Sequence, residues 1–144
     1  MSNSLSLISP HISNFLSNCV ILTLATCADC QPYCANCFYV FDPGNDVLIC
    51  KSDNQSAHMK QATDNRFVAG TILPNPIDFL AIKGVQFTGV FVLPENDFYK
   101  KLYFSKFPIG IDMPGSIWTI RLSEIKMTDN SLGFGTKLKW SRGQ

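Results

Sequence analysis

The sequence predicts a mainly β protein, in which about six or seven antiparallel strands form a closed or half-closed barrel with two or three peripheral helices. Short apolar runs recur along the chain between turn residues, and no β-α-β rhythm of a doubly wound sheet interrupts them. The chain of 144 residues shows no internal repeat or linker. We therefore expect a single domain over residues 1–144.

The first elements follow from a cap and a hairpin pattern. Ser9-Pro10 is an N-cap followed by a first-turn proline, which predicts a short helix over 10–17. Two apolar runs flank a turn-like segment further on, which predicts strands over 19–28 and 32–42. The helix is expected to pack as a lid on the strands.

The next elements follow a strong turn signal. Asp42-Pro43-Gly44-Asn45-Asp46 predicts a turn, and Val47 to Ser52 reads as a third strand. Residues 54–64 carry helix-compatible side chains without an apolar run, and strand character resumes over 66–73. The connection between these two strands is the first place where we expect a ligand.

A long alternating segment over 79–93 predicts a strand, which Gly84 and Gly89 would allow to bend. Pro94 ends it. Residues 95–106 then turn helical, with acidic side chains at the start and aromatic ones at helical spacing.

The last strands are expected over 117–128 and 138–140. The apolar alternation of the first of these slips phase, because Trp118, Ile120 and Leu122 are followed by Ile125 and Met127. The slip predicts a bulge or bend near Ser123 and Glu124.

Four cysteines form the pattern Cys27-x2-Cys30-x3-Cys34-x2-Cys37, a spacing typical of zinc or iron-sulfur ligands. On a regular strand, however, Cys34 and Cys37 point to opposite faces and cannot easily share one ion. Cys27 and Cys30 flank the hairpin tip and would need two further ligands. A Cys-ligated zinc-binding module therefore stays an alternative, while free thiols and no metal are the favoured interpretation.

Charge and hydropathy leave few partner classes. A net charge of +1 and a charged fraction of 16% give no broad basic face for nucleic acid. Met1 to Ile8 lacks the features of a signal peptide, and no later stretch has the apolar length of a membrane helix. We expect a soluble cytoplasmic protein that binds neither nucleic acid nor membrane.

Lys51 to Lys60 is the segment best suited to hold a ligand. It combines serine hydroxyls, backbone amides at a predicted helix start and basic side chains, as a phosphate monoester requires. The alternative is an ordinary solvated connection in which serine only caps the helix. The sequence has neither a P-loop nor a GxSxG elbow, and its only histidines are His11 and His58. If the protein is an enzyme, we therefore expect a cofactor to carry the reactive chemistry.

Several motifs resemble one known family. These motifs are Cys34-Ala35-Asn36 with Phe38-Tyr39, Val68-Ala69-Gly70-Thr71, Ile82-Lys83-Gly84-Val85-Gln86-Phe87, Glu124-Ile125-Lys126, and Thr128-Asp129-Asn130 with Leu132-Gly133-Phe134-Gly135. With the order of the elements, they resemble the YhbP-type family within the FMN-binding split β-barrels related to pyridoxamine-5'-phosphate oxidase. The likeness runs from about residue 10 to Trp140.

This resemblance implies a split β-barrel that binds FMN and acts as a flavin-dependent oxidoreductase on an unknown small molecule. The cofactor contacts that it implies fall on Asn36, Cys37, Phe38, Lys51, Ser52, Ser56, His58, Lys60 and Lys83. The two serines and His58 would grip the phosphate with Lys51 or Lys60 assisting, the second-strand residues would back the isoalloxazine ring, and Lys83 would lie near the ring edge. A histidine in place of the usual basic residue would make the affinity depend on pH. The resemblance also implies a homodimer with each FMN between two subunits.

The chain also departs from the oxidases. Thr128 stands where they place a tryptophan near the flavin, and Lys139-Trp140-Ser141-Arg142 does not match their arginine-bearing C-terminal signature. We therefore do not expect a true pyridoxamine-5'-phosphate oxidase. Non-enzymatic flavin or haem binding, as in a sensor, stays an alternative, because flavin chemistry needs few acid-base groups from the protein. No catalytic residue is predicted.

Overall fold

The computed structural model describes residues 7–143. Within this range, seven strands form one sheet with three α-helices and two short 3-10 helices. In chain order the elements are α1 (Pro10–Asn18), β1 (Ile21–Ala28), β2 (Gln31–Asp42), β3 (Val47–Ser52), α2 (Ala57–Asp64), β4 (Phe67–Ile72), β5 (Lys83–Val92), α3 (Phe98–Lys106), η1 (Pro108–Asp112), β6 (Ser116–Asp129), η2 (Asn130–Leu132) and β7 (Lys137–Ser141). The expected mainly β architecture with six or seven antiparallel strands is confirmed.

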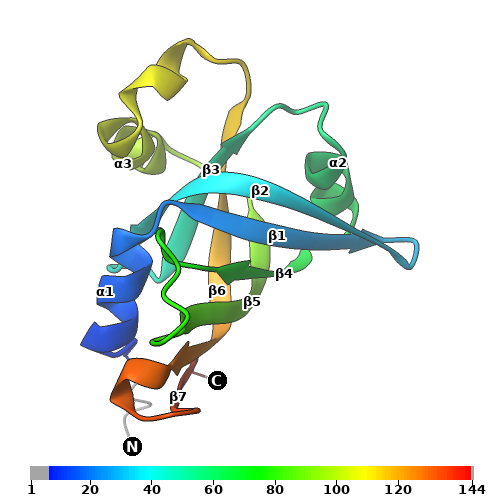
Figure 1. Ribbon diagram of the computed structural model, residues 1–144. Coiled ribbons are helices and arrows are strands. Elements are labelled where there is room, and N and C mark those ends of the chain that lie inside the picture. The colour runs from blue at the N-terminus through cyan, green and yellow to red at the C-terminus, as the bar shows by residue number, and fades with distance from the viewer. Residues whose placement is uncertain (1–6, 144) are drawn as a thin grey trace, which may run out of the picture.

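The sheet closes on itself through its longest strand. Its order is β3-β2-β1-β4-β5-β6-β7, and β3 also pairs with β6. The first half of β6 pairs with β3 over residues 116–121, and its second half pairs with β7 over 124–128. The first half of β6 thus closes a six-stranded barrel by pairing with β3, and its second half extends past β3 and pairs with β7 (Figure 1).

A bulge lies where the sequence predicts one. Thr88 pairs with Glu124 while the next residue, Gly89, pairs with Leu122, which leaves Ser123 as the extra residue of β6. A Cβ atom at Gly89 would lie 2.5 Å from Ile120 Cγ2 and 2.7 Å from the Arg121 carbonyl oxygen. Only glycine fits where the bent strands approach so closely.

One strand boundary differs from the prediction by several residues, while the others differ by at most two. The strand expected over 79–93 begins only at Lys83. The Asp78 carboxylate accepts the Leu80 N–H at 2.9 Å, and the Asp78 carbonyl accepts the Ala81 N–H at 3.2 Å. These local bonds form a turn that competes with a strand ladder, although the apolar pattern alone favours one.

The barrel interior holds the main core, and two helices close its ends. Fully buried side chains from the strands fill it, among them Leu22, Leu24, Tyr39, Leu48, Trp118, Ile120 and Leu122. α1 adds Ile12 and Leu16, and α2 adds Met59 and Ala62. Figure 1 shows these two helices at opposite ends of the β1–β2 hairpin, and α3 apart from both of them. A smaller apolar cluster on the outer face of β3 packs against α3.

No helix within residues 7–143 is long and apolar enough to cross a membrane. The expectation about a signal peptide at Met1 to Ile8 falls mostly on residues 1–6, which lie outside the described residues.

Candidate functional site

A group of polar side chains lies where β3 ends and α2 begins. Ser52 Oγ lies 2.8 Å from His58 Nε2 and accepts the Trp118 Nε1–H at 3.0 Å. Ser56 Oγ lies 3.5 Å from the same nitrogen of His58. The structure therefore brings together Ser52, Ser56 and His58, three of the residues that the sequence predicts for a phosphate. We refer to these three as the polar cluster.

Local chain geometry places the polar cluster. After Ser52 the chain turns at Asp53, whose side chain accepts the Gln55 N–H at 2.9 Å and whose carbonyl accepts the Ser56 hydroxyl at 2.7 Å. Ser56 is the N-cap residue of α2, but its side chain does not cap the helix. The N-terminus of α2 therefore keeps amide groups and a positive dipole end that an anion can use.

Contacts of α2 with the barrel fix the position of His58. Met59 and Ala62 are buried in the main core. Further along the helix, Thr26 of β1 donates its hydroxyl to Gln61 Oε1 at 2.8 Å, and Asn65 donates to the Cys27 carbonyl at 2.9 Å. His58 is consequently held on the side of α2 that faces the end of the barrel.

Burial decides the charge states in and beside the polar cluster. It lowers the pKa of His58 below the ordinary value of 6.5, so the imidazole is neutral at neutral pH. Burial also raises the pKa of Cys37 to about 11, and the hydrogen bond with Ser52 opposes this only partly. Cys37 is thus a protonated thiol inside the barrel. His58 is neutral in the free protein, and an anion bound next to it would favour its imidazolium form.

The three residues predicted on β2 fall on two faces of the strand. Cys37 is buried beside Ser52, whereas Asn36 and Phe38 are exposed on the outer face. Asn36 Oδ1 accepts the Thr23 hydroxyl at 2.8 Å, and the Phe38 ring lies 5.5 Å from that of Phe107. Within one chain these three side chains cannot line a single site.

None of the three predicted lysines joins the polar cluster. Lys51 points out of the barrel and donates to the carbonyls of Met113 and Pro114. Lys60 is exposed on α2. Lys83 is the first residue of β5, and its backbone lies opposite that of Asp129 on β6. Its side chain lines a separate cavity of about 330 Å³ beside α1. The cations expected to assist the phosphate grip therefore point elsewhere, which leaves His58 as the basic side chain of the cluster.

The other histidine occupies a different environment. His11 Nε2 lies 2.5 Å from Oδ2 of Asp129, whose side chain is fully buried. Burial alone would favour the neutral acid, but hydrogen bonds from Ser131 and His11 outweigh it and lower the pKa of Asp129. This pair ties α1 to the end of β6.

The cysteines are spread over the hairpin. Cys27 is half-buried, Cys30 and Cys34 are exposed and Cys37 is buried, and all four are free thiols. Cys34 and Cys37 lie on opposite faces of β2, as strand alternation predicts. Over residues 7–143, no group of three or more His, Cys, Asp or Glu side chains is arranged to hold a metal ion.

Trp118 contacts the polar cluster, although the sequence did not predict it there. It reaches Ser52 because β3 pairs with β6, with Cys50 opposite Trp118. This pairing joins residues far apart in the sequence, and no local motif marks it.

Solved structures share the fold. A putative pyridoxamine 5'-phosphate oxidase from Listeria innocua has a TM-score of 0.67 at 14% identity, over 81% of this chain and 94% of that chain. A FAD-binding protein from Mesorhizobium loti has a TM-score of 0.64 at 16% identity, over 86% and 96%. A heme binding protein from Mycobacterium smegmatis has a TM-score of 0.69 at 19% identity, over 86% and 53%. The chain therefore has the split β-barrel fold of proteins related to pyridoxamine 5'-phosphate oxidase.

Relatives in sequence identify the family. No protein-family model matches the chain. A UPF0306 protein of Serratia proteamaculans (strain 568) is 40% identical over 135 residues, which cover 92% of this chain and 94% of the relative. The UPF0306 protein YhbP of Salmonella arizonae is 37% identical over 134 residues, 91% of either chain. The chain belongs to the UPF0306 (YhbP) family, which confirms the predicted resemblance.

Proposed function

We propose that the protein binds FMN in the cytoplasm and acts as a flavin-dependent oxidoreductase on a small molecule, with the flavin phosphate held at the start of α2. One observation carries the proposal. A serine and a histidine face each other at a helix N-terminus that no side chain caps. Over residues 7–143, His11 makes a salt bridge with a carboxylate and His58 makes none.

The chemistry of this arrangement suits a phosphate monoester. The first amides of α2 are donors, the Ser56 hydroxyl becomes one when it turns from the Asp53 carbonyl to the phosphate, and His58 adds a positive charge once the phosphate favours its protonation. Ser52 positions the imidazole, because its Oγ contacts His58 Nε2 while it accepts the Trp118 N–H. Bound FMN would supply the electron or hydride transfer, and these residues would bind and orient it.

The structural relatives favour a flavin and leave a second candidate. One neighbour in fold is a FAD-binding protein and another a putative pyridoxamine 5'-phosphate oxidase. The Mycobacterium smegmatis neighbour is a heme binding protein, which makes haem binding without catalysis the second candidate. Haem does not need a phosphate grip, so the polar cluster favours the flavin.

The proposal includes a homodimer with the cofactor between two subunits. Exposed apolar side chains lie on the outer face of the sheet, where Ile21 pairs with Phe38 across β1 and β2 and Phe67 follows on β4. The loop before β5 adds Phe79 and Leu80, which are 85% and 95% exposed. Burial of such side chains against a second copy would remove them from water. Sedimentation equilibrium tests this part, and a monomer at micromolar concentration would contradict it.

An FMN titration tests the binding site. The purified chain, stripped of any cofactor, is titrated with FMN while the flavin fluorescence is followed. We expect saturable binding that the double variant Ser56→Ala/His58→Ala weakens at least about tenfold, because a charged hydrogen bond is lost. Ser105→Ala, an exposed serine of α3, is the matched control and should bind FMN like the unaltered chain.

Two outcomes would change the proposal. A haem spectrum without FMN binding would support the second candidate. FMN binding without reduction by a nicotinamide cofactor would weaken the enzymatic part and leave the binding site standing.

A further inference from the structure

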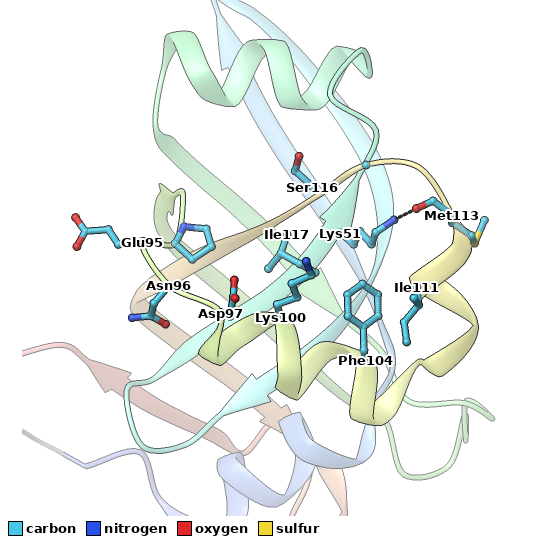
Figure 2. A pocket seen from close by; sticks show the side chains of 12 residues that line it. Lys51, Glu95, Asn96, Asp97, Lys100, Phe104, Ile111, Met113, Ser116 and Ile117 are labelled. Carbon is cyan, nitrogen blue, oxygen red and sulfur yellow. Dashed lines mark hydrogen bonds between the residues drawn. The ribbon is translucent and has the colours of Figure 1, made fainter.

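A cleft away from the polar cluster lies outside the barrel. The end of β3, the start of β6, helix α3 and the η1 segment surround a cavity of about 560 Å³ (Figure 2). This volume falls in the range of small-molecule sites. Its main side chains are Lys51, Asp97, Lys100, Phe104, Ile111 and Ile117.

The cleft and the polar cluster lie on different faces of β3. Lys51 and Ser52 are consecutive strand residues, so their side chains point in opposite directions. Ser52 contacts His58 and Trp118, whereas Lys51 reaches the carbonyls of Met113 and Pro114 on the segment after η1. Gly115 continues this segment so close to β3 that its Cβ would lie 2.5 Å from the Ser52 carbonyl oxygen. The chain itself therefore separates the two sites.

Two ammonium groups line the cleft without carboxylate partners. Lys51 uses two of its three donors on main-chain carbonyls and keeps a third. Lys100 makes no hydrogen bond or ion pair with other residues in the range 7–143. Glu95 and Asp97 also line the cleft, so its two carboxylates match its two lysines in number, and Figure 2 shows both carboxylates on the side of Lys100 away from Lys51. Lys51 and its free donor therefore lie at the end of the cleft nearer η1, which favours an anionic group at that end.

The walls beside these lysines are apolar. Phe104 and Ile117 are half-buried in the cleft, while Ile111 and Met113 are 62% and 60% exposed. Apolar side chains that face a cleft and remain in water gain free energy when a ligand covers them. The occupant should accordingly carry an apolar body behind its anionic group.

We propose that this cleft binds a small organic anion with an aromatic or branched apolar body. Its carboxylate, sulfonate or phosphate group contacts the ammonium groups of Lys51 and Lys100, and its body packs on Phe104 and Ile111. This site is additional to the proposed flavin site and does not depend on it.

Anilinonaphthalene sulfonate, a fluorescent aromatic anion, is the probe that tests this proposal on the full chain. We expect saturable binding of one molecule per chain, displaced by benzoate and not by benzyl alcohol, which lacks the charge. Lys100→Ala should weaken it about tenfold. Lys101→Ala is the matched control, because this exposed neighbour on α3 does not line the cleft and should change the affinity less than twofold.

A second pair of variants tests the apolar wall of the cleft. Both substituted side chains are exposed, so the buried core is unchanged. Ile111→Ser should weaken binding of the probe, and Ile109→Ser, an exposed residue of η1 outside the cleft, should not. Equal weakening by Lys100→Ala and Lys101→Ala would overturn the proposal. So would loss of the probe in Ser56→Ala/His58→Ala, which would place it in the polar cluster. If the chain binds no FMN but passes these tests, the cleft stands and the proposed function fails.

Discussion

The two histidines lie near opposite ends of the barrel and have opposite kinds of partner. His11, on α1, lies 2.5 Å from the buried carboxylate of Asp129. His58, on α2, contacts the hydroxyls of Ser52 and Ser56 and lies with its ring centroid 6.3 Å from that of Trp118. One histidine already has its anion within the fold, whereas the hydrogen-bond partners of the other among residues 7–143 are neutral.

This difference separates a structural contact from a candidate binding site. A histidine paired with a buried carboxylate joins two elements, and removal of either partner is expected to lower stability. A half-buried histidine among hydroxyls, at an uncapped helix start, still has its capacity for an anion. Variants at the two ends should therefore affect different properties, stability at one end and ligand affinity at the other.

The largest expected effect is on stability at the His11 end. Asp129→Ala removes the acceptor of the Ser131 N–H, the Ser131 hydroxyl and His11, all from a buried position. We expect the free energy of unfolding to fall by about 2 to 3 kcal/mol. Urea denaturation measures it, with His58→Ala as the comparison, which should change the free energy of unfolding by less than about 1 kcal/mol. Equal losses in the two variants would remove the distinction between the two ends.

The next effect concerns affinity at the other end. His58→Lys replaces a neutral side chain with one that is charged at neutral pH and can donate a hydrogen bond to Ser52. We expect FMN to bind about tenfold more tightly, because a charged donor contacts the phosphate permanently. Calorimetric titration measures it, and His58→Gln, which keeps a neutral donor, should not tighten binding. Unchanged affinity in the lysine variant would show that this position does not meet the phosphate.

Dependence on pH distinguishes the two ends as well. Burial lowers the pKa of His58, so the imidazole of the free protein is neutral at neutral pH, whereas a bound phosphate favours its protonation. FMN binding should therefore strengthen as pH falls from about 8 to about 6, because the complex takes up a proton in this range. The stability of the ligand-free protein should change in the opposite direction. The unfolded state binds the proton of His58 more readily than the folded state, so the free energy of unfolding decreases as pH falls below 6.5. Asp129, whose pKa is lowered, loses its contribution only as pH falls below 3.8. A flat binding profile from pH 8 to pH 6 would contradict the role of His58.

The smallest expected effect is that of Ser52→Ala. This change removes the acceptor of the Trp118 N–H and the contact that orients His58, while Ser56 and α2 remain. We expect a loss of about 1 kcal/mol in stability and a decrease of about threefold in FMN affinity. Denaturation and titration of one sample measure both. A decrease as large as that of the Ser56→Ala/His58→Ala variant would make Ser52 a direct phosphate contact.

Features that depend on neighbouring residues could be predicted from the sequence. The cap at Ser9, the bulge at Ser123 and the grouping of Ser52, Ser56 and His58 all follow from short spacings. The orientation of Lys51 away from Ser52 follows from strand alternation as well, although resemblance to a family placed both on the phosphate. Family motifs record which residues recur and not which way each side chain points.

Features that depend on distant pairing could not be predicted. Trp118 reaches Ser52 because β6 closes the barrel against β3, and Asp129 reaches His11 because the far end of β6 lies beside α1. The turn at Asp78 shortened an expected strand through two local hydrogen bonds that the apolar pattern does not reveal. These contacts arise from tertiary structure, and no spacing in the sequence encodes them.

A comparison of FMN with riboflavin, which lacks the phosphate, tests the central claim most directly. We expect the unaltered chain to prefer FMN at least about tenfold, and His58→Ala to remove most of this preference while its affinity for riboflavin stays the same. An unaltered chain that binds both flavins equally, or a preference for FMN that survives in His58→Ala, would contradict a phosphate grip at the start of α2.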